Sequence, residues 1–225
     1  MLSKEKFNKL KEINKKYGYG SWTLWPKDES GKKDDPKNKD VSFFGEMEKS
    51  GELFGKLTDK VMMLALNPSG DDNGAKPLLW ENFRGGRYDY RISMLVEKFV
   101  EKKFKCKGCY ITDLFKEKIG SSSKDAEETI RKWEKEGILR EKVEPFVKEL
   151  DAIGLDSLDW IIVFGRDTTY ELLKNLIKDK IFPEKIAEEL KKKVKAVTHY
   201  SFRYIKKGGY WELVKEQLKE QNVPV

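Results

Sequence analysis

The sequence lacks a long apolar run and has few of the cysteines and histidines that redox and metal-binding proteins use. Its 225 residues include one histidine and two cysteines, and it has no apolar run long enough to span a bilayer. The N-terminal stretch is amphipathic and charged, without an apolar signal region, so we expect a cytoplasmic protein that stays out of membranes. The phosphate-loop pattern Gly-Lys-Ser/Thr and the dinucleotide pattern Gly-x-Gly-x-x-Gly are both absent, which leaves nucleotide hydrolysis and hydride transfer with little support.

The two cysteines lie close together, as Cys106-Lys107-Gly108-Cys109. This spacing occurs in half of a zinc site and in dithiol centres. Two thiols and one distant histidine cannot fill a four-ligand site within one chain, so reduced thiols at the entrance of a strand are the favoured interpretation. We predict no metal site and no organic cofactor.

Charge is abundant: 46 basic residues stand against 39 acidic ones, for a formal net charge of +7 and an isoelectric point of about 9.1. Such a balance is compatible with a polyanionic partner. Lys and Glu nevertheless alternate along most expected helices, as in Lys4-Glu5-Lys6, and such faces are usually solvated surface. The charge therefore favours a nucleic-acid partner without establishing one.

Four apolar segments predict strands of a parallel sheet, at 61–66, 109–115, 159–165 and 194–200. Helical spacing is found at 2–17, 41–57 with a break near Gly51, 88–104, 124–133, 140–150, 167–177, 183–193 and 210–221. Strands that alternate with helices indicate the α/β class. We predict a three-layer α/β/α sandwich around a four-stranded parallel sheet. Residues 1–225 would form one domain, with an N-terminal helix in 1–20 and a mobile charged loop at 26–40.

The first predicted strand ends in Asn67-Pro68-Ser69-Gly70. Ligands of open α/β sheets bind beyond the carboxyl ends of the strands, so we place a candidate site here. Two other strand ends carry Asp113 and His199, and the three loops can meet at one crevice. A lone histidine at a strand end is more often structural, and its coincidence with the Asn67 turn is what favours a site.

Large apolar and basic residues follow the first of these turns. Trp80 and Phe83 could form an exposed stacking platform for a base, or they could pack against the edge of the sheet. Arg84 and Arg87, with Arg91, could grip phosphates near a helix start, or they could form local salt bridges.

With these motifs in place, the chain resembles the uracil-DNA glycosylase superfamily. Members carry a Gly-x-Asn-Pro-Gly motif after the first core strand, a Tyr-Ile-Thr-Asn-like segment at the end of the second and a His-Pro-Ser motif after the last. This sequence has Ala-Leu-Asn-Pro-Ser-Gly at 65–70, Tyr-Ile-Thr-Asp-Leu at 110–114 and His-Tyr-Ser at 199–201. Residues 160–167 are similar to the family's junction of strand, glycine, basic residue and helix. The resemblance covers roughly 22–213 in element order.

The resemblance implies base excision, in which a damaged or deaminated base is flipped out of DNA and its N-glycosidic bond is hydrolysed. Asn67 would hold the attacking water, and a neutral His199 would donate a hydrogen bond to the departing base. Further implied contacts are phosphate contacts by Ser69 and Ser201, a wedge of Phe202 and Tyr204, and basic contacts by Arg203, Lys206 and Lys207.

The sequence also departs from the family pattern. Asp113 stands where many members have an asparagine that both donates to and accepts from uracil. A carboxylate only accepts, so it favours a base edge with two donors over uracil; alternatively, Asp113 caps the following segment. Tyr200 replaces a proline, which could reshape the wedge loop. The iron–sulfur branch needs four cysteines, so no cluster is expected.

Two other functions stay open. One is a non-catalytic nucleic-acid-binding module on the same fold. The other, less favoured, is magnesium-dependent phosphoryl transfer that uses Asp71, Asp72 and Asp113. Our leading expectation is a monomeric glycosylase-like enzyme that acts on single-stranded or mismatched DNA.

Overall fold

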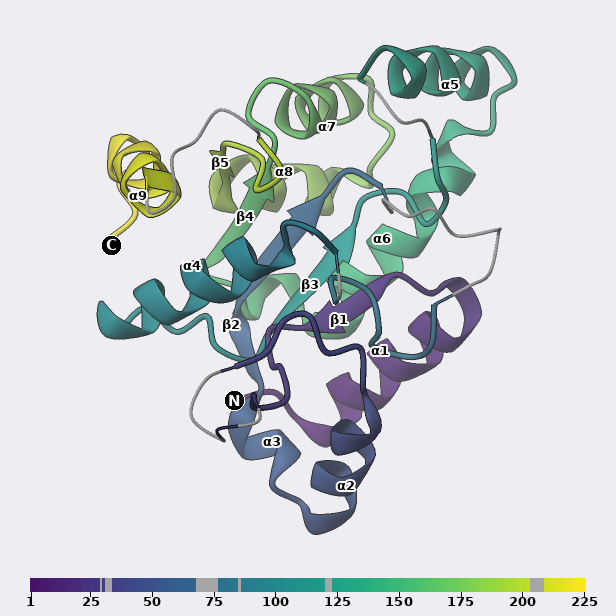
Figure 1. Ribbon diagram of the computed structural model, residues 1–225. Coiled ribbons are helices and arrows are strands. Elements are labelled where there is room, and N and C mark those ends of the chain that lie inside the picture. Colours follow the sequence, from purple (N-terminus) through teal and green to yellow (C-terminus); the bar gives the residue numbers. More distant parts are fainter. Residues whose placement is uncertain (29, 31–33, 68–76, 85, 120–122, 203–208) are drawn as a thin grey trace.

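A five-stranded sheet forms the centre of the computed structural model (Figure 1). The structure describes residues 1–28, 30, 34–67, 77–84, 86–119, 123–202 and 209–225. In spatial order the strands are β1 (Gly20–Trp22), β3 (Cys109–Asp113), β2 (Thr58–Ala65), β4 (Trp160–Phe164) and β5 (Val194–Val197). The chain thus belongs to the α/β class, as predicted.

The sheet is mixed and has five strands, because β1 is added to the four parallel strands that were predicted. β2, β3, β4 and β5 run parallel to one another, and β1 pairs antiparallel with β3. Ser21 lies opposite Ile111 and Trp22 opposite Tyr110. An unpaired edge of β3 would leave backbone groups without partners, and this short segment satisfies them.

Helices connect the strands at nearly the positions that their apolar spacing predicts. Among the described residues they are α1 (Lys4–Tyr17), α2 (Ser42–Ser50), α3 (Leu53–Lys56), α4 (Asp89–Glu101), α5 (Ser123–Lys135), α6 (Leu139–Ile153), α7 (Thr169–Lys178), α8 (Glu184–Lys193) and α9 (Gly209–Glu220), with a 3₁₀ turn at Leu155–Ser157. The break between α2 and α3 falls at Gly51, where φ is 80°. None of the helices that the structure describes combines the length and apolarity needed to cross a membrane.

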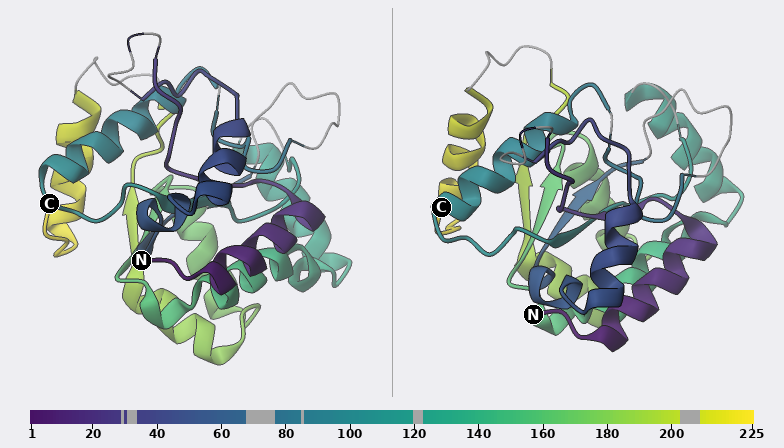
Figure 2. Two further views of the ribbon diagram at one scale, coloured as in Figure 1. Left: turned by 90° about the horizontal axis from the view of Figure 1, so that it is seen from below. Right: turned by 60° about the horizontal axis from the view of Figure 1, so that its bottom comes forward.

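The strands are apolar because helices cover both faces of the sheet (Figure 2). Along β2, Met62 and Leu64 belong to one core, and Val61 and Met63 belong to the other. The first core includes buried side chains of α1, α6, α7 and α8, and the second includes those of α4 and α9. This arrangement gives three layers, and it explains why β2 reads as a continuous apolar run.

The parallel strands reverse their winding direction between β2 and β4. The connection after β2 leads to α4 on one face, whereas the connection after β4 leads to α7 on the other. In open α/β sheets, ligands usually bind at such a switch point, beyond the carboxyl ends of the strands. Ala65 lies beside Asp113, and Phe164 beside Val197, so the strand ends are level there.

Candidate active site

Three residues singled out from the sequence lie at the carboxyl edge of the parallel strands. Asp113 is the last residue of β3, Asn67 is two residues beyond β2, and His199 is two residues beyond β5. Asn67 and His199 are half-buried, whereas Asp113 is 1% exposed. The parallel register brings these strand ends to one edge of the sheet.

Burial favours the neutral imidazole of His199, and hydrogen bonds at Nδ1 set its tautomer. Its Nδ1 accepts a hydrogen bond from the backbone N–H of Ser201 at 3.2 Å, and the Ser201 hydroxyl lies 2.8 Å from the same atom. Burial lowers the pKa of His199 to about 4. An Nδ1 that accepts leaves the ring proton on Nε2, so the imidazole is a donor at Nε2 near pH 7. Ser201 thus orients this ring, and its phosphate contact stays a prediction.

Arg91 fixes the loop that carries His199. Its guanidinium donates to the backbone carbonyls of Tyr200 at 2.8 Å and Phe202 at 2.7 Å. The same group lies over the rings of Tyr88 and Tyr210 and is buried. The sequence suggests a phosphate contact or a salt bridge for Arg91. In the structure its guanidinium bonds to backbone carbonyls. It braces the backbone around His199.

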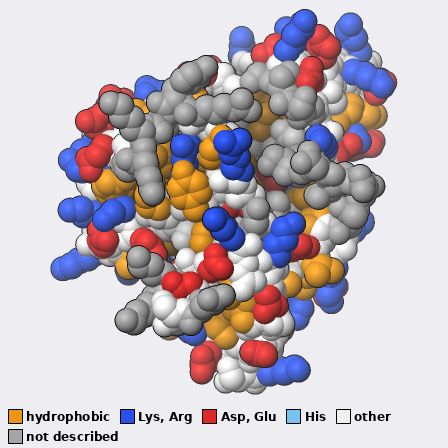
Figure 3. Space-filling model, viewed as in Figure 1, with side chains coloured by type: hydrophobic (Ala, Val, Ile, Leu, Met, Phe, Trp, Pro, Cys, Tyr) orange, Lys and Arg blue, Asp and Glu red, His pale blue; other side chains and the backbone are white. Residues whose placement is uncertain are grey.

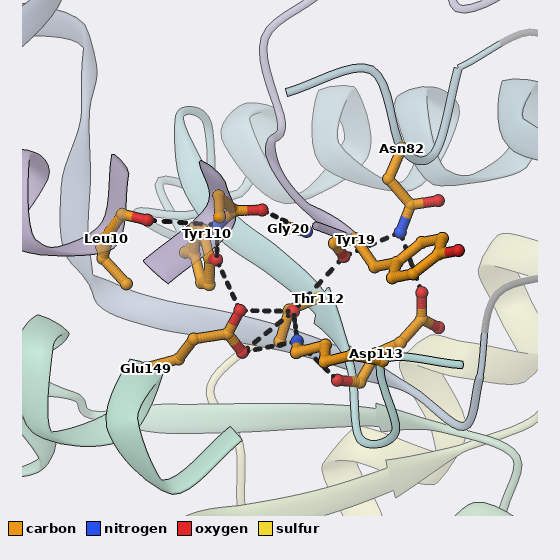
Figure 4. Close-up of polar contacts among 10 residues, drawn as sticks. Leu10, Tyr19, Gly20, Asn82, Tyr110, Thr112, Asp113 and Glu149 are labelled. Atoms are coloured by element: carbon orange, nitrogen blue, oxygen red, sulfur yellow. Dashed lines mark hydrogen bonds and ion pairs between the residues drawn. The ribbon is translucent and has the colours of Figure 1, made fainter. Parts of the chain in front are cut away.

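Asp113 is a buried carboxyl group at the end of β3. Its Oδ2 accepts a hydrogen bond of 2.8 Å from the Asn82 amide, which also donates to the Tyr19 carbonyl (Figure 4). Desolvation raises the pKa of Asp113 to about 7, against the opposing charge of Lys116. The partner of the carboxyl is therefore a side chain from a distant loop, and not the backbone segment that Asp113 was predicted to cap.

A buried polar network supports the end of β3 from the side of α6. Glu149 is 0% exposed and forms an ion pair of 2.7 Å with Lys116. Glu149 also accepts hydrogen bonds from Thr112 and Tyr110, and burial raises its pKa. Lys116 donates in addition to the backbone carbonyl of Asp113 at 2.8 Å. The network was missed from sequence, although Glu149 lies on the apolar side of its helix beside Phe146, Leu150 and Ile153.

The ends of β3 and β5 are close enough to interact electrostatically. Burial raises the pKa of Tyr200, and the negative charges of Asp89 and Asp113 raise it further. Burial likewise raises the pKa of Asp89, at the start of α4, and its carboxylate accepts the N–H of Gly86 at 2.8 Å. Asp113, Asp89 and the residue next to His199 thus belong to one region.

Three predicted base or phosphate contacts lie in the interior. Trp80 is 3% exposed and packs against Phe7, Trp22 and Tyr110, so packing at the sheet edge is its role and an exposed stacking platform is not. Phe83 is buried as well. Arg84 is buried with its guanidinium donating to the backbone carbonyls of Trp80, Trp22 and Leu24. Desolvation lowers the pKa of Arg84 to about 10, and this buried side chain fixes the loop and does not face a phosphate.

The remaining predicted contacts divide between exposed residues and residues outside the described ones. Arg87 is exposed, with its guanidinium over the Tyr88 ring, and Phe202 is 47% exposed beside the His199 loop. Five predicted residues lie outside the part of the chain that the structure describes, namely Ser69, Arg203, Tyr204, Lys206 and Lys207. Acidic and basic side chains are intermixed over the face shown in Figure 3, as the alternating Lys and Glu pattern indicates.

Two cavities occur beside α7. One, of about 450 Å³, lies between α7 and α8 and is lined by Leu173, Lys178 and Leu190 among others. The second, of about 400 Å³, lies between α5 and α7 and reaches Leu66 and Thr168, just beyond β2 and β4. Neither is lined by Asn67, Asp113 or His199. The cleft expected to join Asn67 and His199 is thus neither of these two.

Within the described residues, the cysteines and acidic residues form no metal centre. Cys106 and Cys109 are free and buried, and burial raises the pKa of Cys109 to about 12 and that of Cys106 well above its usual value. Among the residues within the described ranges, no three His, Cys, Asp or Glu side chains are grouped as metal ligands. Asp71 and Asp72, proposed for magnesium, lie outside those ranges.

No protein-family model matches this sequence, and no curated protein is significantly similar to it.

Proposed function

We propose that the protein is a DNA glycosylase that flips a damaged or deaminated base into a site at the carboxyl edge of the sheet, formed by Asn67, Asp113 and His199. The observation that carries the proposal is the hydrogen bond from the Ser201 N–H to Nδ1 of His199, which leaves Nε2 as the donor at the same sheet edge as Asn67 and Asp113. The resemblance of the motifs at 65–70, 110–114 and 199–201 to the uracil-DNA glycosylase superfamily supports it, and a uracil-DNA glycosylase-like fold is part of the same proposal.

The chemistry assigned to His199 follows from its protonation state. Breaking an N-glycosidic bond drives negative charge into the departing base, and a donor aimed at that charge stabilises the transition state more than the ground state. A neutral imidazole with its proton on Nε2 is such a donor, and Ser201 keeps Nδ1 occupied. An imidazolium is not required, which agrees with the lowered pKa of His199.

Asn67 is assigned to the water that attacks the sugar carbon. An amide oxygen can accept a hydrogen bond from water but cannot remove its proton, so the rate would depend mainly on stabilising the leaving base. Arg87 and Phe202 are exposed and are proposed to contact phosphate and to wedge into the duplex, respectively. The same roles are proposed for Ser69, Arg203, Tyr204, Lys206 and Lys207 on the sequence pattern alone.

The experiment is incubation of the protein with oligonucleotides that contain uracil, hypoxanthine or xanthine, in single strands and mismatched duplexes, followed by alkali cleavage. We expect abasic sites in the presence of EDTA. Asn67→Ala and His199→Ala should each reduce base release by about a hundredfold or more while DNA binding stays nearly unchanged. Asn8→Ala, on the exposed face of α1, is the matched control.

The other outcomes identify the alternative functions. Binding of DNA without an abasic product from any base would indicate a non-catalytic binding module. Activity that EDTA abolishes would favour magnesium-dependent chemistry and would contradict the proposed mechanism.

A further inference from the structure

The two oxygens of the Asp113 carboxyl group have different surroundings. Oδ2 accepts the hydrogen bond from Asn82, and no residue in the described ranges donates to Oδ1. In Figure 4 a dashed line from Asn82 reaches one carboxyl oxygen of Asp113, and none reaches the other. One oxygen of this buried carboxyl group is therefore bonded to the protein, and the other has no donor among the described residues.

Asn82 can only be a donor toward Asp113. The amide nitrogen of Asn82 lies 2.8 Å from the Tyr19 carbonyl oxygen and 2.8 Å from Asp113 Oδ2, so its two hydrogens are both used. A flipped amide would place its oxygen against a carbonyl, which cannot donate. Oδ2 of Asp113 therefore always faces a donor.

The loop that presents Asn82 is held in a costly conformation. Trp80 and Phe83, on either side of it, have φ values of 69° and 60°, in the left-handed region that bulky side chains avoid. The Ser21 hydroxyl and the Arg84 guanidinium both donate to the Trp80 carbonyl, at 2.8 and 3.0 Å. Backbone strain that is maintained by surrounding contacts is typical of functional sites.

A proton on Asp113 is therefore placed by Asn82. Because Oδ2 accepts from Asn82, the proton of a neutral carboxyl group belongs on Oδ1, which then donates while Oδ2 keeps a lone pair that can accept. A donor beside an acceptor complements a lactam edge, that is, a ring N–H next to a carbonyl oxygen. Ionised Asp113 offers two acceptors and would repel that carbonyl oxygen.

We infer that Asp113, with its proton directed to Oδ1 by Asn82, selects bases with a lactam edge, such as uracil and hypoxanthine, and loses this selectivity when it ionises. The inference rests on the proposed function for the identity of the ligand as a base. It differs from the expectation drawn from the sequence, which treated Asp113 as a carboxylate and favoured an edge with two donors.

Some of the groups around Asp113 raise its pKa and others lower it. Burial, the largest influence, raises its pKa to about 7, and the negative charges of Glu149 on α6 and Asp89 on α4 also raise it. Lys116 and the hydrogen bond from Asn82 lower it. Tyr200, in the loop after β5, is uncharged near pH 7, since burial and the charges of Asp89 and Asp113 raise its pKa. Both forms of Asp113 are thus accessible near neutral pH.

The test compares wild type with Asp113→Asn, whose amide presents a donor and an acceptor at every pH. For wild type, release of uracil or hypoxanthine from oligonucleotides should fall about tenfold per pH unit above the pKa of Asp113. For Asp113→Asn, release should be nearly flat between about pH 6 and 8.5. Asp151→Asn, at an exposed position on α6, is the matched control and should keep the wild-type profile.

A second variant tests the role of Asn82 directly. The Asn82 hydrogen bond lowers the pKa of Asp113, so Asn82→Leu should move the alkaline fall in release to higher pH. This variant also keeps the inference falsifiable if Asp113→Asn does not fold. A fall at the wild-type pH in Asn82→Leu, or an equal pH dependence in wild type and Asp113→Asn, would overturn the inference.

Calorimetric binding of free uracil and free hypoxanthine separates this inference from the proposed function. Wild type should bind either base at least about tenfold more tightly at pH 6 than at pH 8.5, and Asp113→Asn should bind both equally at the two values. Absence of base release from DNA together with this pH-dependent binding would overturn the glycosylase proposal alone. Absence of binding at both pH values, or binding independent of pH in wild type, would overturn the inference.

Discussion

The ends of β3 and β5 bury titratable groups of opposite type, and burial makes both less charged. Burial raises the pKa of Asp113 to about 7 and lowers that of His199 to about 4, because a poorly solvated environment disfavours the charged form of either. The imidazole is therefore neutral near pH 7, and the carboxyl is partly so. An edge of this kind suits an uncharged ring that offers hydrogen bonds, and it suits a phosphate poorly.

The two strand ends differ in what supports them. A buried ion pair of Lys116 and Glu149 lies beneath Asp113, whereas Arg91 braces His199 through backbone carbonyls. Losing one member of a buried ion pair leaves an uncompensated charge, whereas losing Arg91 leaves two carbonyls without a donor but no unpaired charge. The β3 end should therefore be the more sensitive to mutation.

The largest effect is expected from Glu149→Gln. The variant leaves the Lys116 ammonium, which is 5% exposed, without its carboxylate, and we expect the free energy of unfolding to fall by about 3 kcal/mol. Urea denaturation at pH 7 measures this. Glu144→Gln on the same helix, where the ion pair with Lys148 is exposed, should change stability little. Equal losses in the two variants would contradict the buried network.

Arg91→Met should have a smaller effect on stability and a specific effect on His199. The variant loses two charged hydrogen bonds and the guanidinium contacts with the rings of Tyr88 and Tyr210, for a cost of about 2 kcal/mol. The NMR signals of the His199 ring should shift, and those signals are unambiguous because the chain has one histidine. Arg87→Met is the control, and a ring that shifts equally in both variants would argue against the brace.

The pH dependence of stability should have opposite signs at the two strand ends. The folded pKa of His199 is lowered, so its contribution is present above about pH 6.5, the unfolded value, and is lost as pH falls towards 4. We expect a loss of roughly 1 to 2 kcal/mol that His199→Gln lacks. The folded pKa of Asp113 is raised, so its contribution is lost as pH rises through about 7. Denaturation curves of wild type, His199→Gln and Asp113→Asn between about pH 4.5 and 8.5 measure both slopes.

The smallest effect is expected from Arg87→Ala. If this exposed guanidinium contacts phosphate, DNA affinity should fall severalfold, and the slope of log affinity against log salt should decrease by about one. Lys9→Ala, an exposed basic residue on α1, should leave both unchanged. An unaltered salt slope in Arg87→Ala would remove Arg87 from the DNA contacts.

The sequence predicts the regular elements well because burial on both faces leaves a clear pattern. The apolar runs at 61–66 and 159–165 correspond to β2 and β4, and the helix expected at 183–193 is α8. β1 is different, since three residues carry too little pattern to fix a partner or a direction. Its antiparallel pairing with β3 depends on contacts that only the folded chain provides.

The candidate site is predicted in part for the same reason. Strand ends are readable, so Asn67, Asp113 and His199 could be placed at one edge, whereas their partners come from elsewhere in the chain. Asn82 bonds to Asp113 from a loop in which Trp80 and Phe83 have left-handed backbone angles, and such angles cannot be predicted from these residue types. Trp80, expected either as a stacking platform or in packing at the sheet edge, lies in the aromatic cluster around β1. Arg84, expected to contact phosphate or to form a salt bridge, donates to backbone carbonyls there.

The most direct measurement is the ¹⁵N NMR titration of the single imidazole. The central claim is that the end of β5 keeps His199 neutral as a donor at Nε2. It predicts that the ring stays neutral from pH 7 down to about 5, with its proton on Nε2. A ring that titrates near pH 6.5, or that carries its proton on Nδ1, would contradict the claim.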